Sequence, residues 1–173
     1  DNSVNVWGDW WDELGWKLAT GKGFWVKNPY FPDGEPFYSW RVPGFPLFLA
    51  VIYKIFGHNY LAAKIGLAFI SCLSVILLYL LGKELIDEKA GFISAGIYSI
   101  YPASIFWTGY LAPVTLEIFF LFLLIYLLIR GEKTLKNSLF FFGGIILGIA
   151  SCIRSLFLMY VPVVFLWLLI KNK

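Results

Sequence analysis

The segment LAAKIGLAFISCLSVILLYLL, residues 61–81, is apolar along almost its whole length, with Lys64 as its one charged residue. Its length matches the ~20 residues that a helix needs to cross a hydrocarbon core ~30 Å thick. A strand or loop in hydrocarbon would leave backbone groups unpaired, at a cost of several kcal/mol for each group. The segment therefore predicts a membrane-spanning α-helix.

Four further apolar segments follow it along the chain. We place the five predicted helices at Leu61–Leu81, Ala90–Trp107, Val114–Ile129, Ser138–Cys152 and Leu156–Ile170. Pro102 interrupts the second of them near its end. The predicted fold class is all-α and integral to the membrane: a multi-pass transmembrane helix bundle of about five spans over residues 61–173, preceded by a separate region, residues 1–60.

The amino-acid composition also indicates a protein that is embedded in a membrane. The chain of 173 residues is 60% hydrophobic, 20% aromatic and only 14% charged, and its mean hydropathy is +0.74. Its 14 Lys and Arg stand against 11 Asp and Glu, in short clusters rather than on one basic face. These values exclude a compact water-soluble domain and argue against nucleic acid as a partner. Membrane lipids are the expected surroundings.

Basic residues gather in alternate connections between the predicted helices, which decides the expected orientation. The connections rich in Lys and Arg, with the C-terminal end, hold Lys83, Lys89, Arg130, Lys133, Lys136, Lys171 and Lys173. The opposite connections hold only Arg154. Since Lys and Arg mark cytoplasmic loops, residues 1–60, the 108–113 turn and the Arg154 turn are expected to share the outer face of a cell membrane.

Residues 1–60 differ in kind from the rest, because they hold six of the eight tryptophans, interleaved with charges. At 100° per residue, a helix over Trp7–Thr20 has two unlike sides. One side has Trp7, Trp10, Trp11, Leu14 and Leu18, and the other has Asp9, Asp12, Glu13 and Trp16. Such a helix is expected to lie in the membrane interface. A loop through Pro36 and a second short helix, Leu47–Phe56, complete the predicted extracytoplasmic region of juxtamembrane helices.

Three carboxylates of the first predicted helix, Asp9, Asp12 and Glu13, share a face beside Trp16. A carboxylate at the membrane interface can act as general base on an acceptor hydroxyl, because the low dielectric raises its pKa. The alternative is the solvated polar face of an amphipathic helix. The spacing leaves both interpretations open.

Three isolated charges are further candidates on the same membrane face. Glu117 stands near the outer end of an otherwise uncharged helix, where an ionisable group marks either a functional site or a carboxylate that reaches the headgroups. Arg154, alone in its turn, either holds a phosphate with two hydrogen bonds or anchors the chain at the headgroups. Arg41, just before Pro43, either binds a phosphate or is solvated. His58 lacks partners at metal-ligand spacing and is interpreted as a loop residue.

Small residues at four-residue spacing, Gly144 with Gly148 and Gly91 with Ala95, occur in two of the predicted helices. Such pairs let neighbouring helix backbones approach closely. Chance placement in a Gly-rich apolar chain explains them equally well.

An ordered series of residues extends these observations. Its parts are Gly8-Asp9, Asp12-Glu13-Leu14, Leu18 to Phe24, Arg41 to Ala50, Ile55-Phe56-Gly57, Ala62-Ala63-Lys64, Tyr101-Pro102, Leu116-Glu117, Gly144, Gly148 and Arg154. The series resembles the polyprenyl-phosphate-sugar-dependent glycosyltransferases of the GT-C superfamily. Within them it is similar to the protein O-mannosyltransferase and aminoarabinose lipid A transferase group. The resemblance covers most of the chain.

The resemblance implies an enzyme that transfers a sugar, with inversion, from a polyprenyl-phosphate carrier to a hydroxyl of a lipid, glycan or protein acceptor. It assigns the catalytic base to Asp9 or to Asp12-Glu13, and acceptor or metal binding to Glu117. Arg41 and Arg154 match residues that contact the donor phosphate. A divalent metal ion is a cofactor that the resemblance permits without requiring it. Because the chain starts without Met and lacks the family's preceding helix, we expect an N-terminal fragment of a longer membrane protein.

Two other function classes use the same residue types. A transporter or flippase for a lipid-linked or amphipathic solute would place charges near the midplane of several helices and show an inverted repeat. The ionisable residues of this sequence gather instead at the outer ends of the predicted helices. A non-catalytic membrane subunit would use the Trp-rich region only to bind carbohydrate or lipid. The sequence favours the glycosyltransferase.

Overall fold

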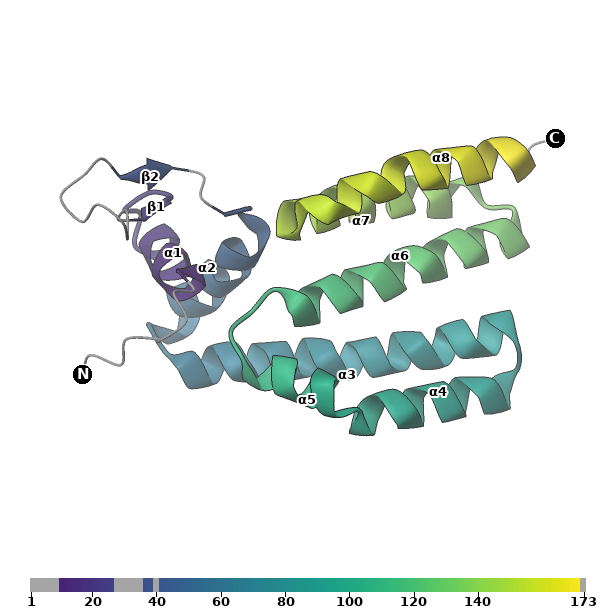
Figure 1. Ribbon diagram of the computed structural model, residues 1–173, viewed down its shortest axis with the longest axis horizontal. Coiled ribbons are helices and arrows are strands. Elements are labelled where there is room, and N and C mark those ends of the chain that lie inside the picture. The colour runs from purple at the N-terminus through teal and green to yellow at the C-terminus, as the bar shows by residue number, and fades with distance from the viewer. Residues whose placement is uncertain (1–9, 27–35, 39–40, 172–173) are drawn as a thin grey trace.

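The computed structural model describes residues 10–26, 36–38 and 41–171, and Figure 1 shows how their elements are arranged. A small layer at one end of the molecule holds two helices and a two-stranded ribbon. Long helices extend from this layer along the length of the molecule (Figure 1). We call the small layer, formed by the described part of residues 10–59, the outer layer.

The outer layer consists of α1 (Trp11–Ala19), β1 (Trp25–Val26), β2 (Phe37–Tyr38) and α2 (Gly44–Phe56). β1 and β2 pair antiparallel, which adds a short ribbon where the sequence predicted only a loop. Helix α1 occupies the predicted helical segment from Trp11 onward, whereas Trp7 and Asp9 lie outside the described residues, and its place in the membrane interface stays a prediction.

Helix α2 begins three residues earlier than predicted, at Gly44 instead of Leu47. Pro46 is the third residue of the helix. The first four backbone N–H groups of a helix have no partner within it, so a proline there removes no hydrogen bond. The prediction was wrong at this boundary because it took Pro46 as part of a turn before the helix.

Helices α1 and α2 pack closely through a buried core that includes Trp11, Phe45, Leu49 and Tyr53. A Cβ atom added to Gly15 would lie 2.6 Å from Leu49 Cβ, so only glycine permits this approach. Trp16 was predicted on the polar side of α1. It is instead half-buried against the same core, because α2 and the residues after it cover that side too.

The long helices are α3 (Tyr60–Leu85), α4 (Glu88–Ile100), α5 (Pro102–Gly109), α6 (Val114–Thr134), α7 (Asn137–Ile153) and α8 (Tyr160–Lys171), with the 3-10 helix η1 (Ser155–Met159) between α7 and α8. Helix α3 packs against both α4 and α6, and α6 packs against α7 (Figure 1). Helices therefore occupy all five predicted segments, and the described chain is predominantly α-helical.

Two of these helices, α3 and α6, are long and apolar enough to cross a membrane, with 26 and 21 residues and hydropathies of 2.4 and 2.1. Asn137–Ile153 and Ser155–Trp167 are shorter apolar helical stretches. The predicted segment Ala90–Trp107 is divided at Tyr101, because Pro102 disfavours helical backbone in the residue before it. The all-α fold is confirmed, while the count of five spans stays a prediction.

Close helix contact occurs at one of the two predicted pairs of small residues. A Cβ atom on Gly91 would lie 2.6 Å from the Tyr79 carbonyl oxygen, so α4 approaches α3 directly at this glycine. Gly144 and Gly148, by contrast, have nothing within 4 Å of an added Cβ atom. For that pair, the alternative of chance placement fits the described residues.

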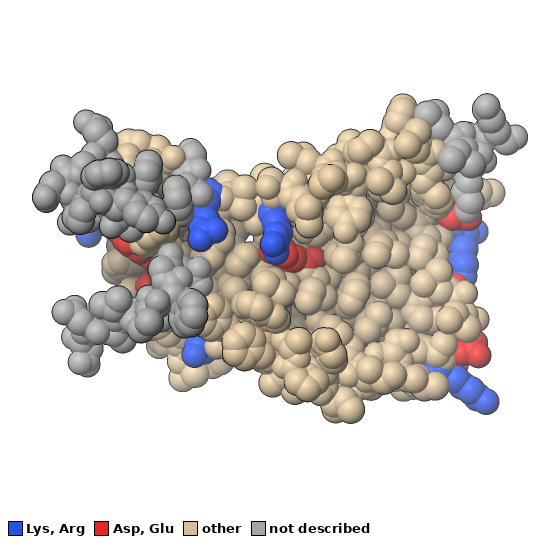
Figure 2. All heavy atoms as spheres, in the orientation of Figure 1, with Lys and Arg blue, Asp and Glu red and all other residues tan. Residues whose placement is uncertain are grey.

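Charged side chains mark the end of the bundle opposite the outer layer. Lys83 pairs with Glu88 across the α3–α4 connection at 3.6 Å, and Lys133 of α6 pairs with Glu84 of α3 at 3.1 Å. Figure 2 shows blue and red spheres gathered at this end, with a broad tan surface between it and the outer layer. The structure thus separates two polar ends by a long apolar stretch.

Candidate functional site

A pocket of about 800 Å³ lies where the outer layer meets the ends of α5, α6 and α7. In Figure 2 two blue patches and one red patch border a hollow at this junction. Its lining residues are Trp11, Arg41, Val42, Phe106, Trp107, Tyr110, Ala112, Pro113, Val114, Glu117, Ile153, Arg154 and Ser155. Three of them, Arg41, Glu117 and Arg154, are the isolated charges that the sequence predicted on one membrane face.

Glu117 lies in the first turn of α6, whose N-terminal end carries partial positive charge and favours a carboxylate. The side chain is only 14% exposed. Its Oε2 accepts a hydrogen bond from the Arg154 guanidinium at 2.7 Å. Its Oε1 is buried and has no hydrogen-bond partner among the described residues. A buried acceptor without a partner is costly, so this oxygen is suited to accept a hydrogen bond from a bound ligand.

Arg154 follows the last residue of α7 and has an extended backbone, which ends the helix and directs the chain into η1. Its side chain is 53% exposed and lines the pocket. A guanidinium has five N–H donors, and the hydrogen bond to Glu117 uses one of them. The residue therefore keeps the capacity to bind a phosphate or another anion inside the pocket.

Arg41 lies on the segment that leads into α2, and its guanidinium is 5.0 Å from the centre of the Trp11 ring. Its Nε atom is buried without a hydrogen-bond partner among the described residues. A cation held against an aromatic face keeps its charge while it loses part of its hydration. Arg41 and Arg154 thus bring two positive charges to one pocket.

A contact between α2 and α7 holds these two arginine-bearing segments together. A Cβ atom on Gly44 would lie 2.5 Å from the Cys152 carbonyl oxygen. The first turn of α2, three residues after Arg41, therefore touches the backbone two residues before Arg154. Glycine at position 44 permits this close approach of α2 and α7 beside the pocket, whose lining includes Val42 and Ile153.

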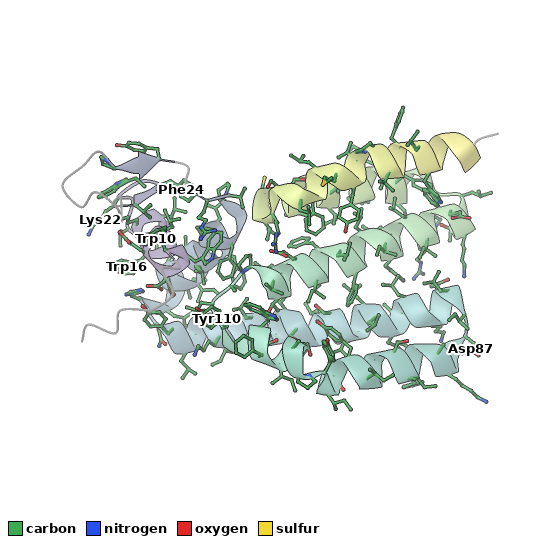
Figure 3. The ribbon with its side chains drawn as sticks, in the orientation of Figure 1. Trp10, Trp16, Lys22, Phe24, Asp87 and Tyr110 are labelled. Atoms are coloured by element: carbon green, nitrogen blue, oxygen red, sulfur yellow. The ribbon has the colours of Figure 1, made fainter. Side chains whose placement is uncertain are left out.

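The remaining wall of the pocket is aromatic. Phe106 and Tyr110 stack with ring centres 6.2 Å apart, and Trp107 meets Tyr110 edge-on at 6.1 Å. Figure 3 shows Tyr110 where the long helices approach the outer layer, far from Asp87 at the opposite end. We did not select these rings from sequence, although Tyr110 stands in the predicted outer 108–113 turn and Phe106 and Trp107 stand at the end of the predicted helix before it.

Asp12 does not line the pocket. Tyr53 donates a hydrogen bond to its Oδ1 at 2.5 Å, and Tyr60 donates to its Oδ2 at 2.8 Å. His58 Nε2 lies 3.0 Å from Oδ2 and stacks on Trp16 with ring centres 4.9 Å apart. Sequence reasoning placed His58 in a loop and missed this contact, because Asp12 is 46 residues away along the chain.

The other two predicted carboxylates differ in what the structure reveals. Glu13 pairs with Lys17 one helical turn along α1 at 2.6 Å, and its side chain is 42% exposed. This arrangement fits the alternative of a solvated polar face. Asp9 lies outside the described residues.

Metal binding finds no support among the described residues, which contain no group of three or more His, Cys, Asp or Glu side chains able to hold an ion. Glu117 is the one carboxylate that the described residues bring to the pocket lining, and it is paired with a guanidinium, whose positive charge opposes a divalent cation at the same oxygen. We therefore derive no step through a metal ion.

Residues 36–173 match the family model described as dolichyl-phosphate-mannose-protein mannosyltransferase. The match includes the whole of α2 to α8 and every pocket residue except Trp11. No curated protein and no solved structure matches the chain.

Proposed function

The chain belongs to the dolichyl-phosphate-mannose-protein mannosyltransferase family, and we propose that it transfers a sugar from a polyprenyl-phosphate carrier to a hydroxyl acceptor at the pocket described above. The family consists of membrane-embedded glycosyltransferases of the GT-C class. Our proposal adds three points to this family membership: the polyprenyl-phosphate carrier of the donor, inversion at the sugar carbon, and transfer at the outer membrane face.

The observation that carries the proposal is one pocket with two arginines, a paired carboxylate and an aromatic wall. A polyprenyl-phosphate sugar joins an anionic phosphodiester to a long apolar chain and a polar sugar. Arg41 and Arg154 suit the phosphate, and the rings of Phe106, Trp107 and Tyr110 suit an apolar chain or a sugar face. Few other ligands would use all of these features together.

The proposed reaction is a direct displacement at the anomeric carbon of the sugar. The acceptor oxygen attacks this carbon while the bond from carbon to the phosphate oxygen breaks, and the acceptor proton passes to a carboxylate base. The lipid phosphate leaves with the additional negative charge, which Arg41 and Arg154 stabilise. Attack on the face opposite the leaving group inverts the configuration.

Asp9 is our candidate for the base, since it precedes pocket-lining Trp11 by two residues in the sequence. Both oxygens of Asp12 already accept hydrogen bonds outside the pocket lining, and Glu13 is paired with Lys17 on α1. Glu117 Oε1 has no hydrogen-bond partner among the described residues, and we assign it the binding of a hydroxyl of the acceptor or of the sugar. The acceptor itself stays open among lipid, glycan and protein.

Charge distribution supports transfer over transport. The two candidate spans carry their Lys, Arg and Glu residues within the first or last five positions of the helix, at the pocket end or at the opposite charged end. A transport path would place polar groups along the length of the helices between these ends. No specific observation on the described residues therefore supports the transporter or flippase interpretation.

The test uses membranes that contain the protein from its complete open reading frame, supplied with labelled polyprenyl-phosphate sugars. Asp9→Asn and Glu117→Gln are expected to abolish or strongly reduce transfer at matched expression. Glu13→Gln is the control, and it should retain wild-type transfer because its charge is paired on the surface of α1. If wild-type protein consumes no donor while lipid-linked sugar crosses the bilayer, the proposal is wrong and the transporter interpretation replaces it.

A further inference from the structure

Asp12 joins three separate parts of the chain through its two carboxylate oxygens. It belongs to α1, whereas Tyr53 is on α2, Tyr60 opens α3 and His58 lies in the joint between them. We call Asp12, Tyr53, His58 and Tyr60 the Asp12 cluster. The cluster fixes α1 to the point where the outer layer passes into the first long helix.

The hydrogen bonds leave Asp12 poorly suited to accept a further proton from a substrate. Tyr53 is only 1% exposed, so its hydroxyl has no access to water as an alternative partner. A buried phenol and a carboxylate form a charge-assisted bond, which is stronger than a neutral one. Burial and the adjacent carboxylate also raise the pKa of Tyr53, so this hydroxyl keeps its proton and remains a donor.

The residue before Asp12 is the one that reaches the pocket. Trp11 is 6% exposed, lies edge-on to Phe45 at 5.6 Å and carries the Arg41 guanidinium over its ring. Consecutive helical residues point about 100° apart, so Trp11 and Asp12 hold α1 on two different sides. A small rotation or shift of α1 would therefore move Trp11 and the arginine that rests on it.

From this geometry we infer that Asp12 is a positioning residue, which acts through the Asp12 cluster to hold Trp11 and Arg41 in the wall of the pocket. This inference rests on the proposed function only where sugar transfer is the measurement. It assigns Tyr53 and Tyr60 a part in donor binding although neither lines the pocket.

Kinetics of transfer separate a positioning residue from a base. Asp12→Ala and Tyr53→Phe should each raise the KM for a labelled polyprenyl-phosphate sugar on the order of tenfold, with little change in kcat. Asp12→Asn keeps an oxygen that accepts from Tyr53 and should recover most of the wild-type KM. The acid limb of the pH profile of kcat/KM should be the same in all three variants. A loss of kcat of about a thousandfold in Asp12→Asn, with loss of that limb, would identify a base and overturn the inference.

Tyr79→Phe is the matched control, because it removes another tyrosine-to-carboxylate hydrogen bond, the one from Tyr79 to Glu88 at the opposite end of the bundle. It should leave both KM and kcat at wild-type values. An equal rise of KM in Tyr79→Phe would show that any loosened hydrogen bond has this effect, and would also overturn the inference.

Amide hydrogen exchange on the purified protein supplies a measurement that does not depend on transfer. Asp12→Ala and Tyr53→Phe should speed exchange in α1 while α3 and α6 keep wild-type protection. Unchanged exchange in α1 would refute the anchoring by Asp12, and faster exchange in all three helices would show a general role in folding instead. If the wild type transfers no sugar, the proposed function fails, and the exchange result still decides the role of the Asp12 cluster.

Discussion

What the side chains of Glu117 and Arg154 can bind depends on the residues that the fold places around them. Each is an isolated charge between apolar residues in the sequence, and the fold brings them to 2.7 Å in one pocket. Because Arg154 is half-exposed, the pair itself adds little to stability. Its value lies in the orientation of two charged groups toward the pocket.

Arg154→Lys tests whether the guanidinium matters beyond its charge. Lysine keeps the positive charge but loses the flat two-donor geometry that fits a phosphate. We expect the KM for the polyprenyl-phosphate donor to rise about tenfold, with a smaller change in kcat. Arg130→Lys at the opposite end of the molecule is the control and should be neutral. Equal KM values for wild type and Arg154→Lys would remove Arg154 from donor binding.

Tyr53 gives a prediction for alkaline stability. Its pKa is raised in the folded protein, first by burial and then by Asp12, whereas an unfolded tyrosine ionises near pH ~10. The stability linked to its proton is therefore complete below pH ~10 and is lost as the pH rises above it. Denaturation midpoints measured at rising pH should fall more steeply for the wild type than for Tyr53→Phe. Parallel slopes would contradict the assignment.

At the scale of residues, sequence reasoning pointed to charges that stand out from their surroundings. Glu117 was chosen because a charge at membrane depth is costly, and Arg41 and Arg154 as single cations of the predicted outer face. The structure brings all three to one pocket, and their roles stay predictions. The Asp12 cluster could not be found, since Asp12 and its partners are more than 40 residues apart and no local pattern joins them. Contacts of this kind depend on how α1, α2 and α3 pack.

At the scale of elements, apolar length predicted every long helix, and backbone chemistry decided their ends. Pro102 divides α4 from α5 although both lie within one apolar run. The tight helix contacts depend on glycines at positions 15, 44 and 91, and four-residue spacing pointed to only one of these. Sequence spacing cannot tell which side of a helix will meet a neighbour, so it left close approach and chance both open at Gly144 and Gly148, where no described neighbour lies.

Gly44→Ala tests the contact between α2 and α7. The new Cβ atom would lie 2.5 Å from the Cys152 carbonyl oxygen, so one helix must move. We expect a loss of about 1–3 kcal/mol in the free energy of unfolding, and reduced sugar transfer because Arg41 shifts relative to Arg154. Gly96→Ala is the matched control: Gly96 lies inside α4 with nothing within 4 Å of an added Cβ. It should be neutral or more stable by about 0.5–1 kcal/mol.

A stable Gly44→Ala protein with full transfer would show that the pocket tolerates a wider separation of α2 and α7. A Gly44→Ala protein that keeps its stability but has a raised KM for the donor would instead show that donor binding depends on the separation of α2 and α7 even when the stability of the fold is unchanged. Thermal midpoints in detergent and transfer rates in membranes together distinguish these results.

At the scale of the whole molecule, the two polar ends and the apolar stretch between them define a membrane orientation. The pocket and the outer layer lie at one end, and the ion pairs of Lys83 and Lys133 lie at the other. The short connections at the second end are rich in lysine and arginine, whereas those at the pocket end hold only Arg154, and this difference predicts that the second end faces the cytoplasm. The pocket would then face outward, where a lipid-linked sugar on the outer leaflet can enter it.

Cysteine labelling tests this orientation in the intact membrane. The native cysteines, Cys72 and Cys152, are both exposed and are first replaced by serine. Single cysteines then replace Lys22 in the outer layer and Lys136 between α6 and α7, both at exposed positions. A maleimide that cannot cross membranes should label position 22 in intact cells and label position 136 only after the cells are opened.

The reverse labelling would place the pocket on the cytoplasmic face, and the donor would then have to present its sugar on the inner leaflet. Labelling of both positions in intact cells would mean that the long helices do not cross the membrane, in spite of the apolar length of α3 and α6. Opposite accessibility of the two positions requires an odd number of membrane crossings between them, and α3, α4, α5 and α6 all lie on that part of the chain. The measurement therefore decides together on which face the pocket lies and whether the long helices between the two positions cross the bilayer.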